Sequence, residues 1–202
     1  LGADILSIIT PSFAVASQKE MYDHYVEVAK HVDVPIVLYN IPARTGNKLL
    51  PETVCRLAKD VEVIKGAKDS SGDWENLKAY IQLTKDLDFS VLSGNDSLIL
   101  PALKEGGVGG IAGCSNVYPK VLSSIYELFQ EGKLDEAQAA QDSIASFRAV
   151  FKYGNPNTVV KTAVAMLGYN VGKCRAPFNQ LPQEGLEALE KVLQENKDKG
   201  MC

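Results

Sequence analysis

The segment that decides the fold is Val61-Glu62-Val63-Ile64-Lys65-Gly66-Ala67-Lys68, which runs directly into the turn Asp69-Ser70-Ser71-Gly72-Asp73. A short apolar run closed by Ser, Gly and Asp predicts a buried strand that ends at a loop. Segments of helical period lie on both sides of it, at Pro51–Lys59 and Asp73–Leu87. A strand between two helices is the repeating unit of a parallel α/β sheet.

The same alternation continues through the first half of the chain. Strand-like runs rich in Val, Ile and Leu are predicted at Ile5–Thr10, Ile36–Asn40, Val61–Lys68, Ser90–Ser93 and Gly109–Ala112. Helices are predicted between them at Gln18–His31, Pro51–Lys59, Asp73–Leu87 and Ser97–Glu105. Pro51 suits a first helical turn, and Asp73 or Ser71 suits a helix cap.

Such units predict a parallel sheet with right-handed crossovers, for which two closures are open. One is a complete, doubly wound open sheet. The other is the latter part of an eight-stranded (β/α) barrel that lacks its first three units. The chain opens on a strand at Leu1, with no initiator Met. This start favours the barrel and suggests a piece of a longer chain.

After Ser115 the alternation stops, and only helical periods follow. They cover Val117–Glu131, Leu134–Tyr153, Asn157–Leu167 and Pro182–Lys199. We therefore expect two parts. Residues 1–131 would form the C-terminal portion of a barrel with five βα units, and residues 132–202 a C-terminal helical region.

Composition excludes several classes of protein. The net charge of −4 over 202 residues is mild and dispersed, so neither a nucleic-acid nor a membrane-binding face is expected. No apolar stretch is long enough to span a bilayer. Cys55, Cys114, Cys174 and Cys202 lack C-x-x-C spacing, and only two histidines occur. We expect no metal site, no disulfide framework, no Ser-His-Asp triad and a reducing, cytoplasmic setting.

Lys68 is the candidate nucleophile, because it stands where a buried strand ends. An unperturbed lysine has a pKa of about 10.4, and burial favours the neutral, nucleophilic amine. Taken alone, a surface lysine is the commoner interpretation. Tyr39 ends the preceding strand. Neighbouring strands lie about 4.8 Å apart, so its hydroxyl could pass protons to and from an imine on Lys68. The alternative for Tyr39 is a core aromatic residue. Lys65 has the opposite strand parity and ranks below Lys68.

Other strand ends supply candidate substrate-binding residues. Arg44, in Pro42-Ala43-Arg44-Thr45-Gly46, could hold a carboxylate with its guanidinium fork, although a solvated loop arginine is the alternative. Thr10, Asp96 and Ile111 are further candidates at this rim, where barrel enzymes place their catalytic groups. Capping of the next helix is the simpler role for Asp96. The glycines at Gly106–Gly110 precede a strand, so they do not fit a dinucleotide loop.

Three motifs resemble the dihydrodipicolinate synthase / N-acetylneuraminate lyase family. They are Tyr39-Asn40-Ile41-Pro42-Ala43-Arg44-Thr45-Gly46, then Gly66-Ala67-Lys68-Asp69-Ser70-Ser71-Gly72-Asp73, then Ser93-Gly94-Asn95-Asp96. Their order matches over essentially the whole chain, including Asn155-Pro156 and the helical tail. The resemblance implies a (β/α)8 TIM barrel of which about strands 4–8 are present, followed by a C-terminal helical bundle. It also implies a homotetramer.

The family performs class I aldolase chemistry. The lysine matching Lys68 forms a Schiff base with pyruvate or another 2-oxo acid, and the tyrosine matching Tyr39 relays protons. The imine is the electron sink, so no cofactor is expected. The units implied to be missing would carry a Gly-Thr-Thr-Gly-Glu-like loop that binds the carboxylate of the 2-oxo acid.

Two features bear on which family member this is. Arg44 matches the arginine that dihydrodipicolinate synthases use for the carboxylate of the aldehyde. Ser12-Phe13 replaces the paired tyrosines that follow Thr-Pro in those synthases, so the tyrosine relay across the subunit interface cannot operate as usual. We predict a lyase most like dihydrodipicolinate synthase of lysine biosynthesis. The alternatives are a 2-keto-3-deoxy sugar-acid aldolase or dehydratase, an N-acetylneuraminate lyase-like enzyme, or a non-catalytic fragment or paralogue.

Overall fold

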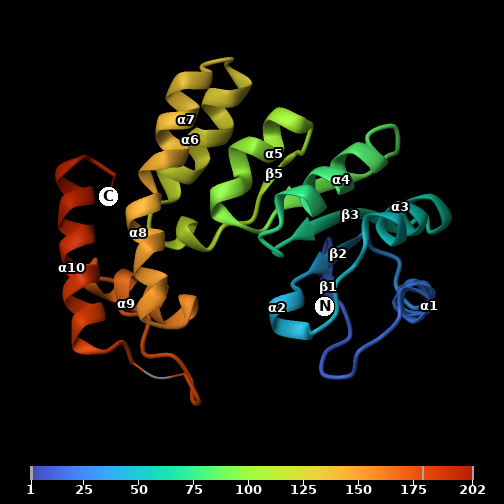
Figure 1. The fold of residues 1–202 in the computed structure, drawn as a ribbon, viewed down its shortest axis with the longest axis horizontal. Helices are drawn as coiled ribbons and strands as arrows, with labels where there is room; N and C mark the ends of the chain where they lie inside the picture. The colour runs from blue at the N-terminus through green and yellow to red at the C-terminus, as the bar shows by residue number, and fades with distance from the viewer. Residues whose placement is uncertain (1, 179, 202) are drawn as a thin grey trace. The chain divides into compact units, whose positions relative to one another are not determined.

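The computed structural model describes residues 2–178 and 180–201. Its contacts divide the chain into two compact units, residues 1–111 and 112–202. Strands alternate with helices in the first unit, and the second is helical (Figure 1). The predicted boundary after Glu131 separates the C-terminal portion of a barrel from the helical region. It stays a prediction for residues 112–131.

The first unit contains a sheet of five parallel strands whose order in the sheet is their order in the chain. The strands are β1 (Leu6–Ile9), β2 (Ile36–Asn40), β3 (Ile64–Asp69), β4 (Ser90–Ser93) and β5 (Gly109–Gly110). A doubly wound sheet reverses its strand order at a switch point. The strands seen here do not reverse, so they follow the winding of a barrel. The predicted parallel α/β sheet is confirmed.

Four helices of this unit pack on a single face of the sheet. They are α1 (Gln18–Ala29), α3 (Pro51–Asp60), α4 (Trp74–Thr84) and α5 (Ile99–Glu105), which follow one another along the same side of the strands in Figure 1. Sheet and helices share one apolar core that includes Tyr25, Ile36, Leu38, Leu57, Ala67, Tyr80, Val91 and Ala102. Successive side chains of a strand point to opposite faces. The other face therefore carries Val37, Tyr39, Lys68 and Leu92, all only partly buried.

Several predicted boundaries are wrong, each for a local reason. β3 begins at Ile64 rather than Val61, because α3 runs through Asp60 and the Val61 amide still donates to the Leu57 carbonyl. It extends to Asp69, which pairs with β2. β5 stops at Gly110, because Ala112 already caps the short 3-10 helix η2 (Gly113–Asn116).

Three helical predictions also need correction. α1 ends at Ala29, and α4 covers Trp74–Thr84 with Asp73 as its N-cap, where the Asp73 carboxylate accepts from the Asn76 amide at 3.2 Å. A four-residue helix, α2 (Pro42–Thr45), stands where a turn was predicted. Gly46 ends it with a φ of 80°, a conformation that glycine adopts readily.

The second unit contains η2, α6 (Pro119–Gln130), α7 (Leu134–Ser143), α8 (Ala145–Ala149), η3 (Val150–Tyr153), α9 (Pro156–Met166) and α10 (Gln183–Asp198). The single helix predicted over Leu134–Tyr153 is therefore wrong, because it divides into α7, α8 and η3. At Ile144 the ψ angle is −9°, well above the value of about −42° in an α-helix. Tyr118 and Phe147 pack edge to face inside this unit, with ring centroids 5.4 Å apart.

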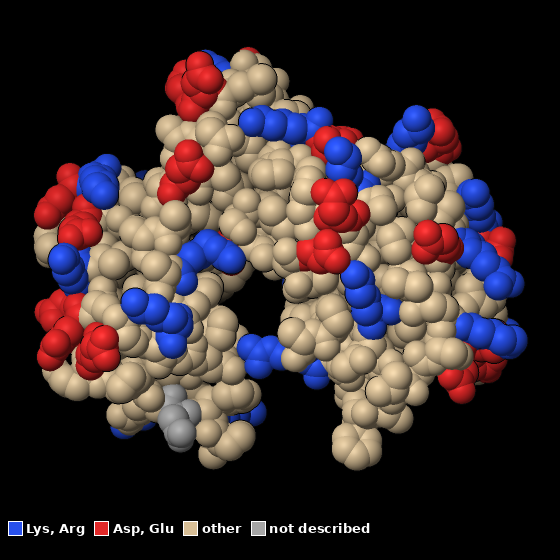
Figure 2. Space-filling model, viewed as in Figure 1, with Lys and Arg blue, Asp and Glu red and all other residues tan. Residues whose placement is uncertain are grey.

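Charged side chains and cysteines are distributed over the described part of the chain. Lys and Arg alternate with Asp and Glu over each unit in the view of Figure 2. Cys55 and Cys174 are free thiols, Cys114 is buried, and Cys202 lies outside the described residues. Across residues 2–178 and 180–201, no group of three or more His, Cys, Asp or Glu residues could hold a metal ion. Over the same ranges, no helix has the length and apolarity needed to cross a bilayer.

Candidate active site

Lys68 and Tyr39 lie side by side at the C-terminal ends of β3 and β2. They are register partners in the sheet, and the Lys68 amine is 4.0 Å from the centre of the Tyr39 ring. Both side chains are half-buried and belong to the sheet face opposite the helices. The structure therefore brings together the amine and the phenol that the sequence proposed as a pair.

Lys65 has a different environment, although it is only three residues away. Its amine donates to the Asp88 carboxylate at 2.7 Å, and its side chain is 40% exposed. The hydrogen bond to Asp88 raises the pKa of Lys65. A raised pKa keeps the amine charged at neutral pH, so Lys65 is a poor nucleophile. Of these two lysines, only Lys68 lies beside a phenol.

Gly94 makes room for the Lys68 side chain. A Cβ atom added at position 94 would lie 1.9 Å from Ser70 Oγ and 2.9 Å from Lys68 Cε. Any larger residue would have to displace one or both side chains. Gly94 directly follows β4, the strand next to that of Lys68. No role was predicted for it from the sequence. Ser70, which follows Lys68 by two residues, was also missed as a neighbour of the site.

Arg44 and Thr10 are placed near the ends of β2 and β1. Arg44 is exposed on α2, and within the described residues its guanidinium makes no ion pair or hydrogen bond. Thr10 is 1% exposed, and its hydroxyl donates to Thr45 Oγ1 at 2.8 Å. Thr10 thereby ties the end of β1 to the helix that carries Arg44. Direct contact of either residue with a substrate stays a prediction.

Asp96 and Ile111 follow β4 and β5. Asp96 is 5% exposed and opens the 3-10 helix η1 (Asp96–Leu98). The cap of η1 is Asn95, which accepts from the Ser97 amide at 3.1 Å. Capping of the following helix by Asp96 stays a prediction. Ile111 is 47% exposed, and its amide donates to the Ser93 carbonyl at 2.8 Å. Substrate contact by these two residues remains a prediction.

Phe13 projects from the loop after β1. Its side chain is 99% exposed, and its φ angle is 78°. A bulky residue at positive φ is uncommon and strained. The backbone amide of Phe13 donates to the Thr45 carbonyl at 3.3 Å, which holds this loop against α2.

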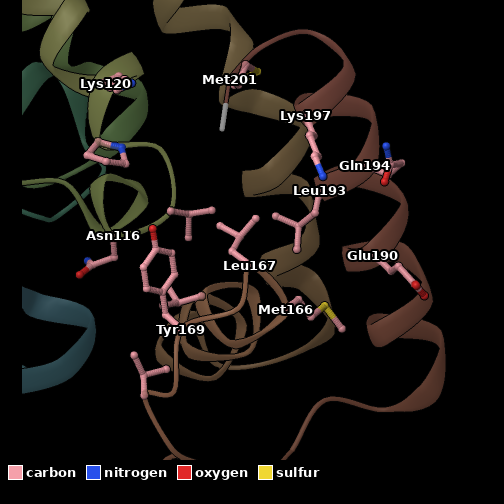
Figure 3. A pocket seen from close by; sticks show the side chains of 14 residues that line it. Asn116, Lys120, Met166, Leu167, Tyr169, Glu190, Leu193, Gln194, Lys197 and Met201 are labelled. Carbon is pink, nitrogen blue, oxygen red and sulfur yellow. The ribbon is translucent and has the colours of Figure 1, made fainter.

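The helical unit has a pocket of its own, drawn in Figure 3, with a volume of about 950 Å³. Val164, Leu167 and Leu193 supply apolar lining. Lys197 points from α10 toward the pocket in Figure 3, and Glu190 points away from it. None of the predicted site residues lines this pocket.

Comparison with known proteins gives consistent matches. The family model described as the dihydrodipicolinate synthetase family matches residues 1–196. The 4-hydroxy-tetrahydrodipicolinate synthase of Methanospirillum hungatei is 37% identical over 194 residues, which are 96% of this chain and 66% of that protein. The synthase of Methanoculleus marisnigri is 39% identical over 193 residues, 95% of this chain and 65% of that one.

Solved structures agree with these relatives. Dihydrodipicolinate synthase from Thermotoga maritima superposes with a TM-score of 0.92 at 30% identity, covering 97% of this chain and 67% of that chain. A prophage protein of the dihydrodipicolinic acid synthase family from E. coli K12, in complex with pyruvate, gives a TM-score of 0.90 at 26% identity, with 100% and 68% coverage. The chain spans about two thirds of the length of the proteins it matches. With the family model matched over residues 1–196, the chain belongs to the dihydrodipicolinate synthetase family.

Proposed function

We propose that this chain carries the Schiff-base site of a lyase that joins pyruvate to an aldehyde or cleaves the product, most like a 4-hydroxy-tetrahydrodipicolinate synthase. The observation that carries the proposal is the Lys68 amine lying 4.0 Å from the Tyr39 ring centre. Curated relatives with this name and the pyruvate complex of the E. coli family member support it.

The chemistry begins with attack of the neutral Lys68 amine on the ketone carbon of pyruvate. The carbinolamine loses water to form a protonated imine, which withdraws electrons from the adjacent methyl group. Loss of a methyl proton gives an enamine, whose carbon attacks the aldehyde and forms the new carbon–carbon bond. Water then hydrolyses the imine and frees Lys68. Tyr39 passes protons to and from the carbinolamine oxygen, because its ring adjoins the amine.

Arg44 provides a second recognition element in this proposal. Its guanidinium is exposed and has no protein partner in the described part of the chain. An arginine fork binds a carboxylate with two parallel hydrogen bonds. We assign it to a carboxylate on the aldehyde. Thr10, Asp96 and Ile111 border the same end of the sheet and would shape the remaining rim.

Within the family fold, we assign the five strands to strands 4–8 of a (β/α)8 barrel. Their sequential order and the helices on one face support this assignment. Residues 1–131 would then hold five βα units, with α6 following the eighth strand, and residues 132–202 the C-terminal helical region. We also propose a homo-oligomer, a tetramer as in the family, working in the cytoplasm.

A second candidate function is cleavage or dehydration of a 2-keto-3-deoxy sugar acid. The observation that favours it is Phe13, which has no hydroxyl and is 99% exposed at the position where synthases carry a tyrosine. Both functions use the same imine on Lys68. They differ in the aldehyde, so product analysis with each type of substrate separates them.

The test uses a partial reaction that needs no aldehyde. Enamine formation exchanges the methyl protons of pyruvate with solvent, and proton NMR in D2O follows the loss of the methyl signal. We expect exchange with the parent chain, none above background with Lys68→Ala, and undiminished exchange with the control Lys65→Ala. A Tyr39→Phe variant should be slower by about 10²-fold or more. A folded parent chain without exchange would reject the proposal and favour a non-catalytic protein that keeps the scaffold.

A further inference from the structure

We propose that Asn40 and Asp69 are positioning residues that fix the register of Tyr39 against Lys68. This inference rests on the proposed function, because it concerns the geometry of the same pair. Asn40 and Asp69 each follow one member of the pair in the chain. They are themselves register partners, directly after the Tyr39 and Lys68 partners.

The two pairs lie on opposite faces of the sheet. Successive residues of a strand alternate in direction, so Asn40 and Asp69 point toward the helices while Tyr39 and Lys68 point away. Asn40 is 0% exposed and Asp69 is 2% exposed. The Asn40 side-chain amide donates to Asp69 Oδ1 at 2.8 Å. A buried hydrogen bond thus joins the two strands directly behind the candidate catalytic pair.

The Asp69 carboxylate accepts three more hydrogen bonds. The Ser71 amide donates to Oδ1 at 3.0 Å, and the Ser71 hydroxyl donates to Oδ2 at 2.9 Å. The side-chain amide of Asn76, on α4, donates to Oδ2 at 3.1 Å. A buried carboxylate is costly unless its oxygens are paired. Four donors from β2, the β3–α4 turn and α4 satisfy it, and they fix where β3 ends.

Asn40 is anchored from its other side as well. Its side-chain oxygen Oδ1 accepts from the Leu49 amide at 3.0 Å. The Leu49 carbonyl in turn accepts from the Tyr80 hydroxyl at 2.6 Å. Burial raises the pKa of Tyr80, so the phenol remains a hydrogen-bond donor at neutral pH. The chain of bonds from Tyr80 through Leu49 and Asn40 to Asp69 connects α4 with both strands.

The register between the C-terminal ends of β2 and β3 has to be fixed by a local interaction. The β2–β3 ladder is irregular between Ile36 and Val37, where Ile36 pairs with Ile64 and Val37 pairs with Gly66. Pairing at the start of the two strands therefore does not determine pairing at their ends. A slip of one residue would turn Lys68 to the opposite face from Tyr39. The Asn40–Asp69 bond lies at the position where such a slip must be prevented.

The experiment compares two variants with a matched control. Asn40→Leu removes the bond to Asp69, and the reciprocal variant with Asn40→Asp and Asp69→Asn keeps a donor and an acceptor between the strands. Thr84→Val is the control. The Thr84 hydroxyl is buried in the same unit and donates to the Tyr80 carbonyl at 2.7 Å. Its loss should lower stability without affecting the site.

Two readouts are independent of pyruvate. Amide hydrogen exchange reports Ser70, whose N–H donates to the Asn40 carbonyl at 2.8 Å. Treatment with a limiting amount of acetic anhydride, followed by peptide mapping, gives the ratio of acetylation at Lys68 to that at Lys65. In Asn40→Leu we expect Ser70 to exchange about tenfold faster and the Lys68 to Lys65 ratio to change. Neither should change in Thr84→Val.

The third readout is the pyruvate methyl exchange. We expect Asn40→Leu to lower its kcat about tenfold or more with little change in KM, and the reciprocal variant to regain most of the loss. Suppose that Asn40→Leu unfolds at the same urea concentration as Thr84→Val, while its Ser70 exchange rate and its acetylation ratio stay at the parent values. The inference is then overturned. A parent chain without methyl exchange would reject the proposed function alone, because the first two readouts still decide the positioning role.

Discussion

At the scale of the residue, the proposed function depends on the different surroundings of two lysines that lie three residues apart. Lys65 and Lys68 belong to the same strand. The amine of Lys65 is held charged by Asp88, and that of Lys68 adjoins a phenol. The ladder is irregular at Lys65, since Ile36 pairs with Ile64 and Val37 pairs with Gly66, so strand parity alone does not separate the two lysines. The preference for Lys68 as the proposed nucleophile therefore rests on the side chain that each amine contacts.

Gly94→Ala tests how closely the site is packed. The added methyl group would lie 1.9 Å from Ser70 Oγ and 2.9 Å from Lys68 Cε, both near the ends of movable side chains. We expect little loss of folding stability but a fall in pyruvate methyl exchange of about tenfold or more, because displacement of a reacting group by a fraction of an ångström is costly. Adding Ser70→Ala should restore part of the activity. Equal activity of Gly94→Ala and the parent would contradict the packing argument.

Arg44→Leu tests recognition of the aldehyde. An arginine–carboxylate hydrogen bond contributes about 1.5–3 kcal/mol, so KM for an aldehyde bearing a carboxylate should rise about 10- to 100-fold. Pyruvate methyl exchange should stay at the parent rate. Arg44→Lys keeps the charge without the fork and should recover only part of the loss. A loss of the same size in pyruvate exchange would assign Arg44 to the 2-oxo acid instead.

At the scale of the element, the sequence predicted which segments form strands and helices better than it predicted where each one begins and ends. Every predicted strand exists, because apolar runs closed by Gly, Ser and Asp leave little alternative. Their ends depend on backbone hydrogen bonds that composition does not reveal. Val61 looks like a strand residue by its side chain, yet its amide completes α3. Asp69 looks like a turn residue, yet it is the last rung of β3. The hydrogen bond between Asn40 and Asp69, behind Lys68, could not be predicted for that reason.

Asp73 provides a test of one helix start. Its carboxylate caps α4 and pairs with Lys48 at 2.9 Å. The hydrogen bond from Lys48, followed by that from the Asn76 amide, lowers the pKa of Asp73. A depressed pKa contributes stability above the unfolded value, near pH 4, and that stability is lost as the pH falls through the folded value. At pH 7, Asp73→Ala should cost about 1 kcal/mol of unfolding free energy.

Urea unfolding at several pH values measures this effect. Asp73→Ser keeps a capping oxygen and loses only the exposed pair with Lys48, so it should stay within about 0.5 kcal/mol of the parent. The difference between parent and Asp73→Ala should shrink below pH 4. A difference that stays constant down to pH 2 would show that the carboxylate charge has no part in the cap.

At the scale of the whole molecule, the candidate site residues named above belong to the strand-bearing unit. Tyr39, Arg44, Lys68 and Gly94 all lie within residues 1–111. The sequence predicted this distribution, since the motifs occupy the alternating half of the chain. It could not predict how the strand ends pack against one another. Contacts such as Gly94 with Lys68 join segments distant in sequence, and no periodicity encodes them.

Phe13 tests the proposed homo-oligomer. Phe13→Gly removes a fully exposed aromatic ring and relieves a positive φ angle that costs a non-glycine residue about 1–2 kcal/mol. If a second copy covers the ring, we expect weaker association by analytical ultracentrifugation together with a more stable monomer in urea. Ser12→Gly, in the adjacent exposed position, is the control. Unchanged association in Phe13→Gly would remove this loop from the interface.

The most direct measurement is reduction of the imine with borohydride in the presence of pyruvate, followed by peptide mapping in a mass spectrometer. Reduction fixes the pyruvate carbons on the amine that formed the imine. We expect the added mass on the peptide containing Lys68, and none in Lys68→Ala. An adduct on Lys65, or no adduct on a folded chain, would contradict the central claim that the amine beside Tyr39 is the nucleophile.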